Sequence, residues 1–398
     1  MLNSAGFGKR VDELVLCSLI APLLLLGALW YPLRLFGLGT SADFVWFYAA
    51  GRVLLGGAAS HLYDPPVLFN HPPFEAILFA PLAYFSYSTA FLIWTFCSLS
   101  LLGCTFFLFR LYGTTFTLGD RLILLGAGFY PVLAVLIQGQ DSLWVLMAYV
   151  FAFFALKRGE EFRAGCILAT GLIKPQLVVP FVLILALRGR WKFVAGFSAS
   201  GCILLLLSLV LVGPATVAHY STMPFQMTEN EGLKTFYIFP STMPNLRGLL
   251  YLLFGGFVPP AVLGAGTGVL SLGLVGWAAF LKKKAEAFDL DFSISMAVTL
   301  LVSFHLLLHD LSLLILPVFL ALNFLRVCSL TWSRGGIWVI GPVLALFVVL
   351  FSLQIAGAKE FAPAGLIVLA FALGLAALLR AGTGVEGASL RLVGPDGG

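Results

Sequence analysis

The sequence has little charge. Only 10% of its 398 residues are Lys, Arg, Asp or Glu, whereas 60% are hydrophobic, and the mean hydropathy is +1.03. A soluble chain of this length needs far more charge to cover its surface, so the composition excludes a soluble enzyme and predicts an integral membrane protein. The net charge of +5 is small, and Lys and Arg cluster between apolar runs. That distribution orients a chain in a membrane, and no nucleic-acid partner is expected.

Cysteine and nucleotide-binding motifs are also scarce. The six cysteines form no Cys-x-x-Cys pair and most lie in apolar runs, so neither a disulfide framework nor a zinc site is expected. The sequence contains no P-loop, no Gly-x-Gly-x-x-Gly that opens a helix after a strand, and no Gly-x-Ser-x-Gly. Nucleotide chemistry therefore has no support, and neither a cofactor nor a bound metal is expected.

Long apolar runs are abundant. A membrane span needs about 20 apolar residues. Such runs occur at 12–36, 89–111, 119–137, 139–157, 192–213, 258–281, 336–356 and 361–380. Lys9-Arg10 precedes the first run, which is longer than the core of a signal peptide and is expected to remain as an anchor.

Two further apolar stretches are expected to turn back on themselves. The pair 294–308 and 309–326 predicts a tight antiparallel hairpin with His309-Asp310 at its tip. The stretch 164–187 is interrupted by Lys174-Pro175, and proline disfavours helix at the residue before it. We expect two half-helices that enter and return, because the basic residues that flank them then lie on the cytoplasmic side.

Together these segments predict an all-α polytopic membrane protein with about 12 crossings and both termini in the cytoplasm. One domain is expected over 1–380, with outer-face loops at 37–73 and 214–257 and a disordered, Gly-rich cytoplasmic tail at 381–398. The run 74–87 is short and rich in proline, and either a full crossing or a half-span or surface helix is compatible with it.

Asp43 is the most informative single residue. It follows the first span directly and stands among aromatic residues at the membrane surface. A carboxylate in such a place is costly to desolvate and is a site candidate by default. One interpretation makes Asp43 a general base, because burial can raise a carboxylate pKa toward the working pH. The other makes it the N-cap of a helix that begins at residue 44.

Other polar residues are expected on the same outer face, at the tips of spans and in the two loops. They are Asp64, Gln140, Asp141, Lys174, Arg247, His305, His309 and Asp310. Polar groups that converge in an apolar cavity are typical of a binding site.

Most of these residues also have a structural interpretation. Asp141 starts a helix, where a carboxylate stabilises the first turn, whereas the amide of Gln140 suits sugar hydroxyls. Lys174 either extends its ammonium group to the membrane surface or contacts a lipid phosphate. His305 and His309 are spaced to share one helical face, which allows a metal pair or, as we prefer, hydrogen bonding and phosphate contact.

Several short motifs follow one another between the apolar spans. They are Asp43 to Tyr48 with Gly56-Gly57, Leu62-Tyr63-Asp64, His71-Pro72-Pro73-Phe74, Gly139-Gln140-Asp141, Gly165 with Ile173-Lys174-Pro175, Asn245-Leu246-Arg247-Gly248 and His309-Asp310-Leu311. In order and spacing this set resembles glycosyltransferase family 87, the polyprenyl-phosphate-mannose-dependent mannosyltransferases of GT-C type. Many relatives have Tyr in place of His71 and a small polar residue or Asn in place of Asp141-Ser142, which leaves the sugar and the acceptor open.

The resemblance implies a GT-C fold in the inner or plasma membrane with its site on the extracytoplasmic face. It implies a polyprenyl-phosphate-linked sugar donor, mannose by analogy, a lipid or glycan acceptor, and inversion at the anomeric carbon. Asp43 would then be the base. The cations that meet the donor phosphate would be Lys174, Arg247 and His309. The sugar or acceptor would be bound by Asp64, Gln140, Asp141, His305 and Asp310.

Two other functions are compatible with the same polar residues. A lipid-linked-sugar transporter or flippase would also gather polar groups in an apolar cavity. The sequence shows no internal repeat of the kind that many transporters carry. A glycan ligase, which moves a whole lipid-linked oligosaccharide, is not separated from single-sugar transfer by the sequence.

Overall fold

The computed structural model describes residues 43–64, 67, 69–112, 128–229, 240–281, 288–328, 334–357 and 360–381. The regular secondary structure of these residues is all helical, with no strand among them. The predicted anchor 12–36 and most of the tail 381–398 lie outside these ranges, as do residues 119–127 of the predicted span 119–137.

Five of the described helices are long and apolar enough to cross a membrane. They are Tyr87–Tyr112, Trp191–Met223, Pro260–Ala279, Leu308–Leu325 and Gly335–Gln354. The chain therefore has the helices of a membrane protein, and the total of about 12 crossings stays a prediction.

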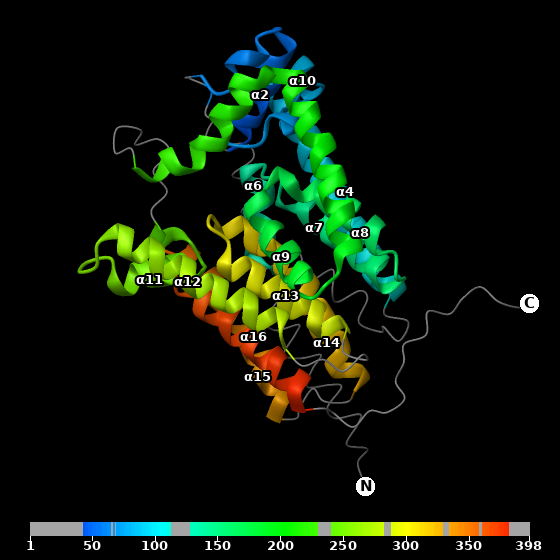
Figure 1. Ribbon diagram of the computed structural model, residues 1–398, viewed down its shortest axis with the longest axis vertical. Helices are drawn as coiled ribbons and strands as arrows, with labels where there is room; N and C mark the ends of the chain where they lie inside the picture. The colour runs from blue at the N-terminus through cyan, green and yellow to red at the C-terminus, as the bar shows by residue number, and fades with distance from the viewer. Residues whose placement is uncertain are drawn as a thin grey trace, which may run out of the picture.

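The centre of the molecule is helix α13 (Phe288–Val302), whose residues 289–301 are all buried. It packs against α9 (Val179–Leu187), α12 (Pro260–Ala279), α14 (Ile315–Val327) and α16 (Ala364–Ala381). Helix α15 (Arg334–Ile355) covers α16 on the outside (Figure 1). We call this assembly, together with α6 (Tyr130–Gln138) and α7 (Ser142–Lys157), the bundle.

A second group of helices flanks the bundle. Helices α4 (Tyr87–Tyr112) and α8 (Glu161–Ala169) pack on α7, and α10 (Trp191–Glu229) runs along α8. The contact between α8 and α10 has no room for side chains at two facing glycines. A Cβ at Gly165 would collide with the carbonyl oxygen of Phe193, and one at Gly196 with that of Phe162. Small residues let the two backbones approach closely, as is common between membrane helices.

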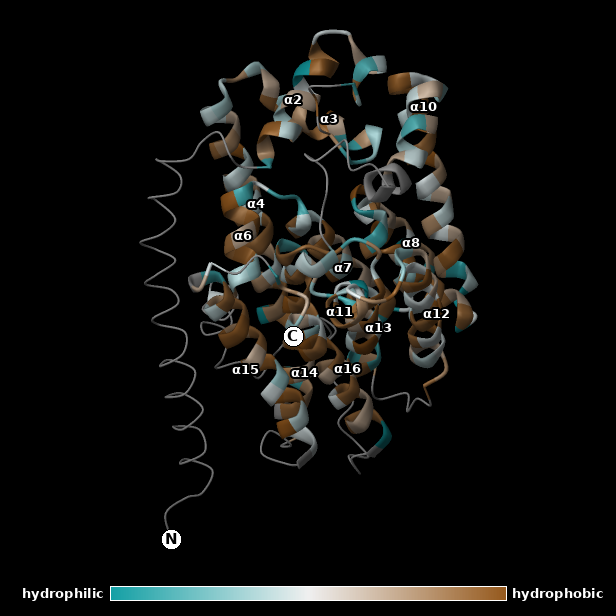
Figure 2. Cartoon of the chain, turned by 90° about the vertical axis from the view of Figure 1, so that its left-hand side faces the viewer, coloured by the Kyte–Doolittle hydropathy of each residue, from teal (hydrophilic) through white to brown (hydrophobic). Residues whose placement is uncertain are grey.

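The cap is the part of the chain that lies over one end of the bundle. It consists of residues 43–86, with α2 (Phe44–Leu55) and α3 (Ala76–Phe79), and the part of α10 that follows the break at Gly213, where φ is +83°. Figures 1 and 2 show α2 and this part of α10 at the same end of the molecule in two perpendicular views. The cap has a core of its own, built around aromatic residues such as Phe44, Phe69 and Phe79. The hydroxyl of Thr216 on α10 donates to the carbonyl of Ser60 (3.1 Å) and ties the two parts together.

The segment 74–87 consists of short helical turns, at Pro73–Glu75, α3 and Leu82–Tyr84. Its prolines interrupt any longer helix. It does not cross the bundle, which agrees with the half-span or surface alternative.

The chain breaks at Lys174, as the following proline predicts. Helix α8 and a 3₁₀ turn at Thr170–Ile173 lead up to it, and a second turn at Pro175–Leu177 leads into α9. Arg190 Nη1 lies 2.5 Å from Glu161 Oε1, so the two ends of this segment lie together and the chain enters and returns.

The prediction that His305 and His309 share one face of a helix is wrong. Helix α13 ends at Val302, residues 303–307 are not helical, and His309 belongs to a 3₁₀ helix, Leu308–Leu314. Asp310 helps to fix this break, because its Oδ2 accepts from the backbone N–H of Leu307 (3.0 Å). The two histidines therefore do not form an i, i+4 pair.

Ion pairs fasten the bundle at the end far from the cap. Lys157 Nζ lies 2.6 Å from Asp289 Oδ1, and Arg188 Nη2 lies 2.8 Å from Asp291 Oδ1. Both aspartates are in the first turn of α13, whereas the other end of α13 leads to residues 303–310 beneath the cap. The bundle thus has one end that ion pairs hold together and another end that carries the candidate site.

The glycine contact between α8 and α10 gives a first prediction. Gly165→Leu should lower the thermal unfolding temperature of the detergent-purified protein, because overpacking against a backbone costs about 1–3 kcal/mol or more. Gly103→Leu is the matched control, since no atom lies within 4 Å of a Cβ there. Tryptophan fluorescence during heating measures both, and equal unfolding temperatures for the two variants would contradict the close contact.

Candidate functional site

The candidate site lies where the cap meets the bundle, around a sharp turn at Gly139. Gly139 has φ +67°, and a Cβ on it would lie 2.7 Å from Cβ of Phe44 and 2.9 Å from the ring of Phe91. The indole N–H of Trp94 donates to its carbonyl (2.9 Å). Only glycine fits this conformation and this space. The turn aims the glutamines on either side of it, Gln138 and Gln140, into the junction.

Asp43 is held by the bundle. Its Oδ2 accepts a hydrogen bond from Nε2 of Gln140 (2.8 Å). Asp43 stands at the N-cap position of α2, but its side chain makes no capping hydrogen bond. Helix capping therefore does not explain the position of the Asp43 carboxylate, whereas the hydrogen bond from Gln140 does.

Lys174 is the centre of the network. It is only 4% exposed, so of the two alternatives given for Lys174, the one in which its ammonium group extends to the membrane surface does not hold. Its Nζ lies 2.8 Å from Asp310 Oδ1 and 2.9 Å from Asp141 Oδ1. It also donates to Ser142 Oγ (3.0 Å) and to Gln140 Oε1 (3.2 Å). Gln140 thus joins the buried ammonium group of Lys174 to the carboxylate of Asp43.

Asp310 and His309 bring the non-helical end of α13 into the same network. Asp310 Oδ1 accepts from Ser142 Oγ (2.8 Å) as well as from Lys174. His309 is buried, and its Nδ1 lies 2.8 Å from Oε1 of Gln138, a contact that fits a proton on Nδ1. Its other nitrogen, Nε2, lies 3.5 Å from Asp310 Oδ1, beyond a good hydrogen bond.

His71 and Glu75 extend the network into the cap. His71 Nδ1 lies 2.8 Å from Glu75 Oε2 and 3.4 Å from Asp141 Oδ2. Burial acts to lower the pKa of His71, but the charges of Glu75 and Asp141 outweigh it and raise that pKa to about 10. Burial raises the pKa of Glu75 to about 8, against the opposing effect of His71. Both residues lie outside the five candidate spans.

Three predicted site residues lie apart from these contacts. Asp64 is exposed and pairs with His61 Nδ1 (2.7 Å). Arg247 lies over the ring of Phe304, 4.3 Å from its centre, and donates to the Phe304 carbonyl (3.2 Å). His305 lies in the non-helical segment 303–307, and the charges of Asp310, Lys174, His309 and Arg247 act on it.

Four residues of the network were not predicted as site residues: Gln138, Ser142, His71 and Glu75. Ser142 and Gln138 flank the Gly-Gln-Asp motif, and His71 stands in the His-Pro-Pro motif. Of these four residues, Glu75 has the clearest signal in the sequence. Acidic residues are few in this chain, and Glu75 stands four positions after His71.

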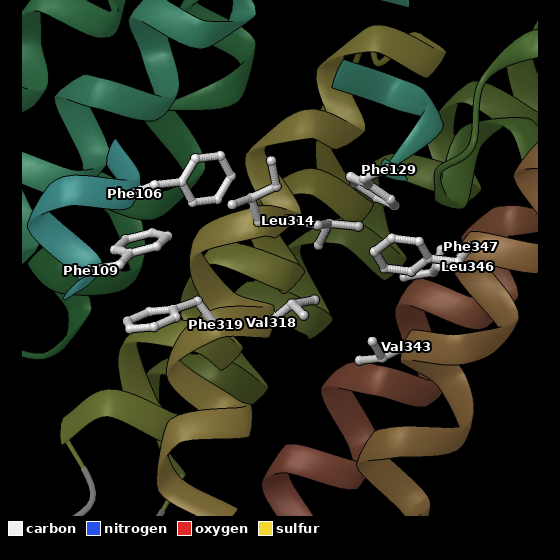
Figure 3. Close-up of a pocket in the computed structure, with 10 residues that line it drawn as sticks. Phe106, Phe109, Phe129, Leu314, Val318, Phe319, Val343, Leu346 and Phe347 are labelled. Atoms are coloured by element: carbon white, nitrogen blue, oxygen red, sulfur yellow. The ribbon is translucent and has the colours of Figure 1, made fainter. Parts of the chain in front are cut away.

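An apolar crevice lies deeper in the bundle (Figure 3). Its walls are side chains of α4, α14, α15 and neighbouring turns, among them Phe106, Phe109, Phe319 and Phe347. It reaches Leu314, four residues after Asp310 on the same 3₁₀ helix. The polar network is thus continuous in sequence with an apolar wall.

The buried ion pairs of Lys174 give a second prediction. Lys174→Met should destabilise the protein by about 3–5 kcal/mol, because it leaves Asp141 and Asp310 as buried charges without their cation. Adding Asp310→Asn to Lys174→Met should recover part of that loss. Thermal unfolding in detergent compares the three proteins. A double variant no more stable than Lys174→Met would contradict the assignment.

The pKa values of His71 and Glu75 predict lower stability in alkaline solution. The folded protein favours charged His71, a contribution that is complete below pH 6.5 and is lost as the pH rises to about 10. It disfavours ionised Glu75, so stability also falls between pH 4.5 and about 8. The unfolding temperature, measured in a chelator-containing buffer, should therefore fall across this range. Glu75→Gln should flatten the fall below about pH 8, and an unchanged slope would contradict the pKa assignment.

Comparison with known proteins identifies the family of the chain. A family model described as glycosyltransferase family 87 matches residues 69–304, more than half of the sequence. No curated protein and no solved structure matches the chain. The matched region contains Gln140, Lys174 and Arg247, whereas Asp43 and Asp310 lie outside it. The resemblance seen in the short motifs is therefore confirmed, and the chain belongs to glycosyltransferase family 87, the members of which are glycosyltransferases.

Proposed function

We propose that this membrane glycosyltransferase moves a sugar, mannose by analogy, from a polyprenyl-phosphate donor to a hydroxyl of a lipid or glycan acceptor, with Asp43 as general base. The observation that carries the proposal is the contact between Asp43 and Gln140, which holds one carboxylate oxygen at the junction of cap and bundle. The other oxygen, Oδ1, accepts no hydrogen bond from any residue in the described ranges. It is the atom that we expect to receive the proton.

The reaction is a single displacement. The acceptor oxygen attacks the anomeric carbon while Asp43 takes the hydroxyl proton, a general-base step that typically contributes 10²–10⁴-fold. The bond between the anomeric carbon and the phosphate oxygen breaks, and its electron pair leaves with the polyprenyl phosphate. Attack from the face opposite to the leaving group inverts the anomeric configuration.

Cations would meet the charge that grows on the departing phosphate. Lys174, Arg247 and His309 are the proposed groups, and fixed charges of this kind are usually a large part of a rate enhancement. Lys174 already contacts Asp141, Asp310, Ser142 and Gln140, so a phosphate would have to displace one of them. Arg247 is only partly buried and lies beside the non-helical segment that carries His305, where a headgroup can approach.

The sugar and the acceptor would be bound by the remaining polar residues. Gln140 and Asp310 lie in the network, and Asp141 pairs with Lys174, so these three position other groups as well as any sugar. We keep His305 as a sugar or acceptor contact because the charges of both Arg247 and Asp310 act on it. Asp64 remains a proposed acceptor contact at the exposed edge of the cap.

A lipid-linked donor would bring its prenyl chain to apolar surface near Asp310. The crevice that reaches Leu314, four residues after Asp310, is lined by aromatic and aliphatic side chains (Figure 3). Its open space is about 30 Å³, so these side chains would have to move apart for a prenyl chain to enter. Burial of apolar surface contributes about 25 cal/mol per Å² to such binding. We place this site on the extracytoplasmic face, because the basic clusters at Lys157 and Arg188 lie at the other end of the bundle.

A transfer assay with purified protein tests the proposal. Asp43→Asn should reduce transfer from a radiolabelled polyprenyl-phosphate sugar about 10²–10⁴-fold while donor binding persists. Glu160→Gln is the control, because Glu160 lies near the end of the bundle far from the cap, where it pairs with Arg163. It should retain wild-type transfer.

The other outcomes are equally informative. If Asp43→Asn is as active as wild type, Asp43 is not the base. If the wild-type protein transfers no sugar from any such donor, the result favours the transporter alternative. Transfer of a whole oligosaccharide in preference to one sugar would identify a glycan ligase.

A further inference from the structure

A second group of side chains lies next to Lys174, and two of its three members, His71 and Glu75, have no role in the proposed displacement. His71 precedes the first turn of the Pro73–Glu75 segment in the cap, Glu75 ends that segment, and Asp141 precedes α7 in the bundle. One ligand atom from each of the three lies within 4.8 Å of the others. Imidazole nitrogen and carboxylate oxygen are common metal ligands.

The distances suit a single ion. Two ligand atoms that are about 2.1 Å from one ion lie about 3.0 Å apart at a right angle and about 3.4 Å apart at a tetrahedral angle. His71 Nδ1 is 2.8 Å from Glu75 Oε2 and 3.4 Å from Asp141 Oδ2. Small movements of the carboxylates would bring all three atoms onto one ion.

One oxygen of the group has no hydrogen-bond partner among the residues that the structure describes. Glu75 is fully buried, and its Oε1 accepts no hydrogen bond from the described part of the chain. A buried polar atom without a partner costs about 1–3 kcal/mol, and more if it carries charge. This carboxylate is fixed in the group by its other oxygen, Oε2, which contacts His71. A cation would satisfy both oxygens of Glu75.

We propose that His71, Glu75 and Asp141 bind one divalent transition-metal ion, Mn²⁺ or Zn²⁺. One nitrogen and two carboxylate ligands favour these ions over Mg²⁺ or Ca²⁺, which prefer oxygen alone. His71 retains some exposure, 13% of its side chain, which gives the ion a route to the site. This site is separate from the histidine pair considered in the sequence, and it departs from the expectation that the chain binds no metal.

The ion would fasten the cap to the bundle. Asp141 presents Oδ2 to His71 and Oδ1 to Lys174, so one carboxylate would bridge the metal and the ammonium group. Lys174 in turn contacts Gln140, which holds Asp43. The metal is thus a positioning element for the network, and the donor phosphate need not touch it.

Metal binding tests this proposal without any sugar substrate. The protein, purified in detergent, is stripped with EDTA, desalted and titrated with Mn²⁺, and free Mn²⁺ is followed by electron paramagnetic resonance. A parallel Zn²⁺ sample is dialysed and its metal measured by mass spectrometry. We expect one ion per chain, a higher unfolding temperature with metal, and a spin-echo signal from one imidazole nitrogen on bound Mn²⁺.

The chain offers a matched pair of histidine variants. His71→Gln should weaken binding at least 10-fold and remove the nitrogen signal. His61→Gln should change neither, although His61 also contacts a carboxylate through Nδ1 (2.7 Å), because that pair is exposed. If His71→Gln does not fold, Glu75→Gln replaces it, with the same expected loss of affinity.

Three results would overturn the proposal. The first is wild-type protein that binds neither ion stoichiometrically. The second is one bound ion without a nitrogen signal, which places the metal elsewhere. The third is binding that survives both His71→Gln and Glu75→Gln, or that is lost equally in His61→Gln.

Discussion

The junction of cap and bundle depends on the buried ammonium group of Lys174. A charge that leaves water costs several kcal/mol, which close carboxylates must offset. Lys174 has two of them, Asp141 and Asp310, within 3 Å. These three residues come from segments far apart in the sequence, so one electrostatic requirement fixes the turn after Gly139, the break before Pro175 and the non-helical end of α13. Gln140 then transmits that geometry to Asp43 in the cap.

Much of this arrangement follows from local sequence rules. The break at Lys174 follows from Pro175, and the Gly139 turn follows from a position that accepts no Cβ. Because charged residues are few, a polar group at the tip of an apolar run stands out in the sequence. Gln140, Asp141, Lys174, His309 and Asp310 are candidate site residues of this kind, and the fold brings them together.

The remainder depends on tertiary contacts that no spacing encodes. The apolar pair 294–308 and 309–326 predicts a helix through His305. In the structure, Asp310 accepts a hydrogen bond from the backbone N–H of Leu307, and residues 303–307 are not helical. The local sequence around Asp43 is compatible with a helix N-cap, because it contains only the helix that follows. The partner that the structure gives Asp43 is Gln140, which is 97 residues away in the sequence. The sequence places Glu75 four residues after His71, but only the fold brings Asp141 against the same imidazole. Local sequence predicts where the helices break, and ion pairs between distant residues decide which side chains come together at those breaks.

Family membership and geometry support one chemistry from different directions. Membership in glycosyltransferase family 87 makes the chain a glycosyltransferase. In the proposed mechanism Asp43 is the base, and Gln140 joins it to the buried ammonium group of Lys174, which would meet the phosphate. A single carboxylate base predicts one displacement, whereas a double displacement needs a nucleophile as well. The most direct measurement is therefore the anomeric configuration of the product, by NMR, after transfer from a polyprenyl-phosphate donor labelled with ¹³C at its anomeric carbon. The account predicts complete inversion, and retention of configuration would contradict it.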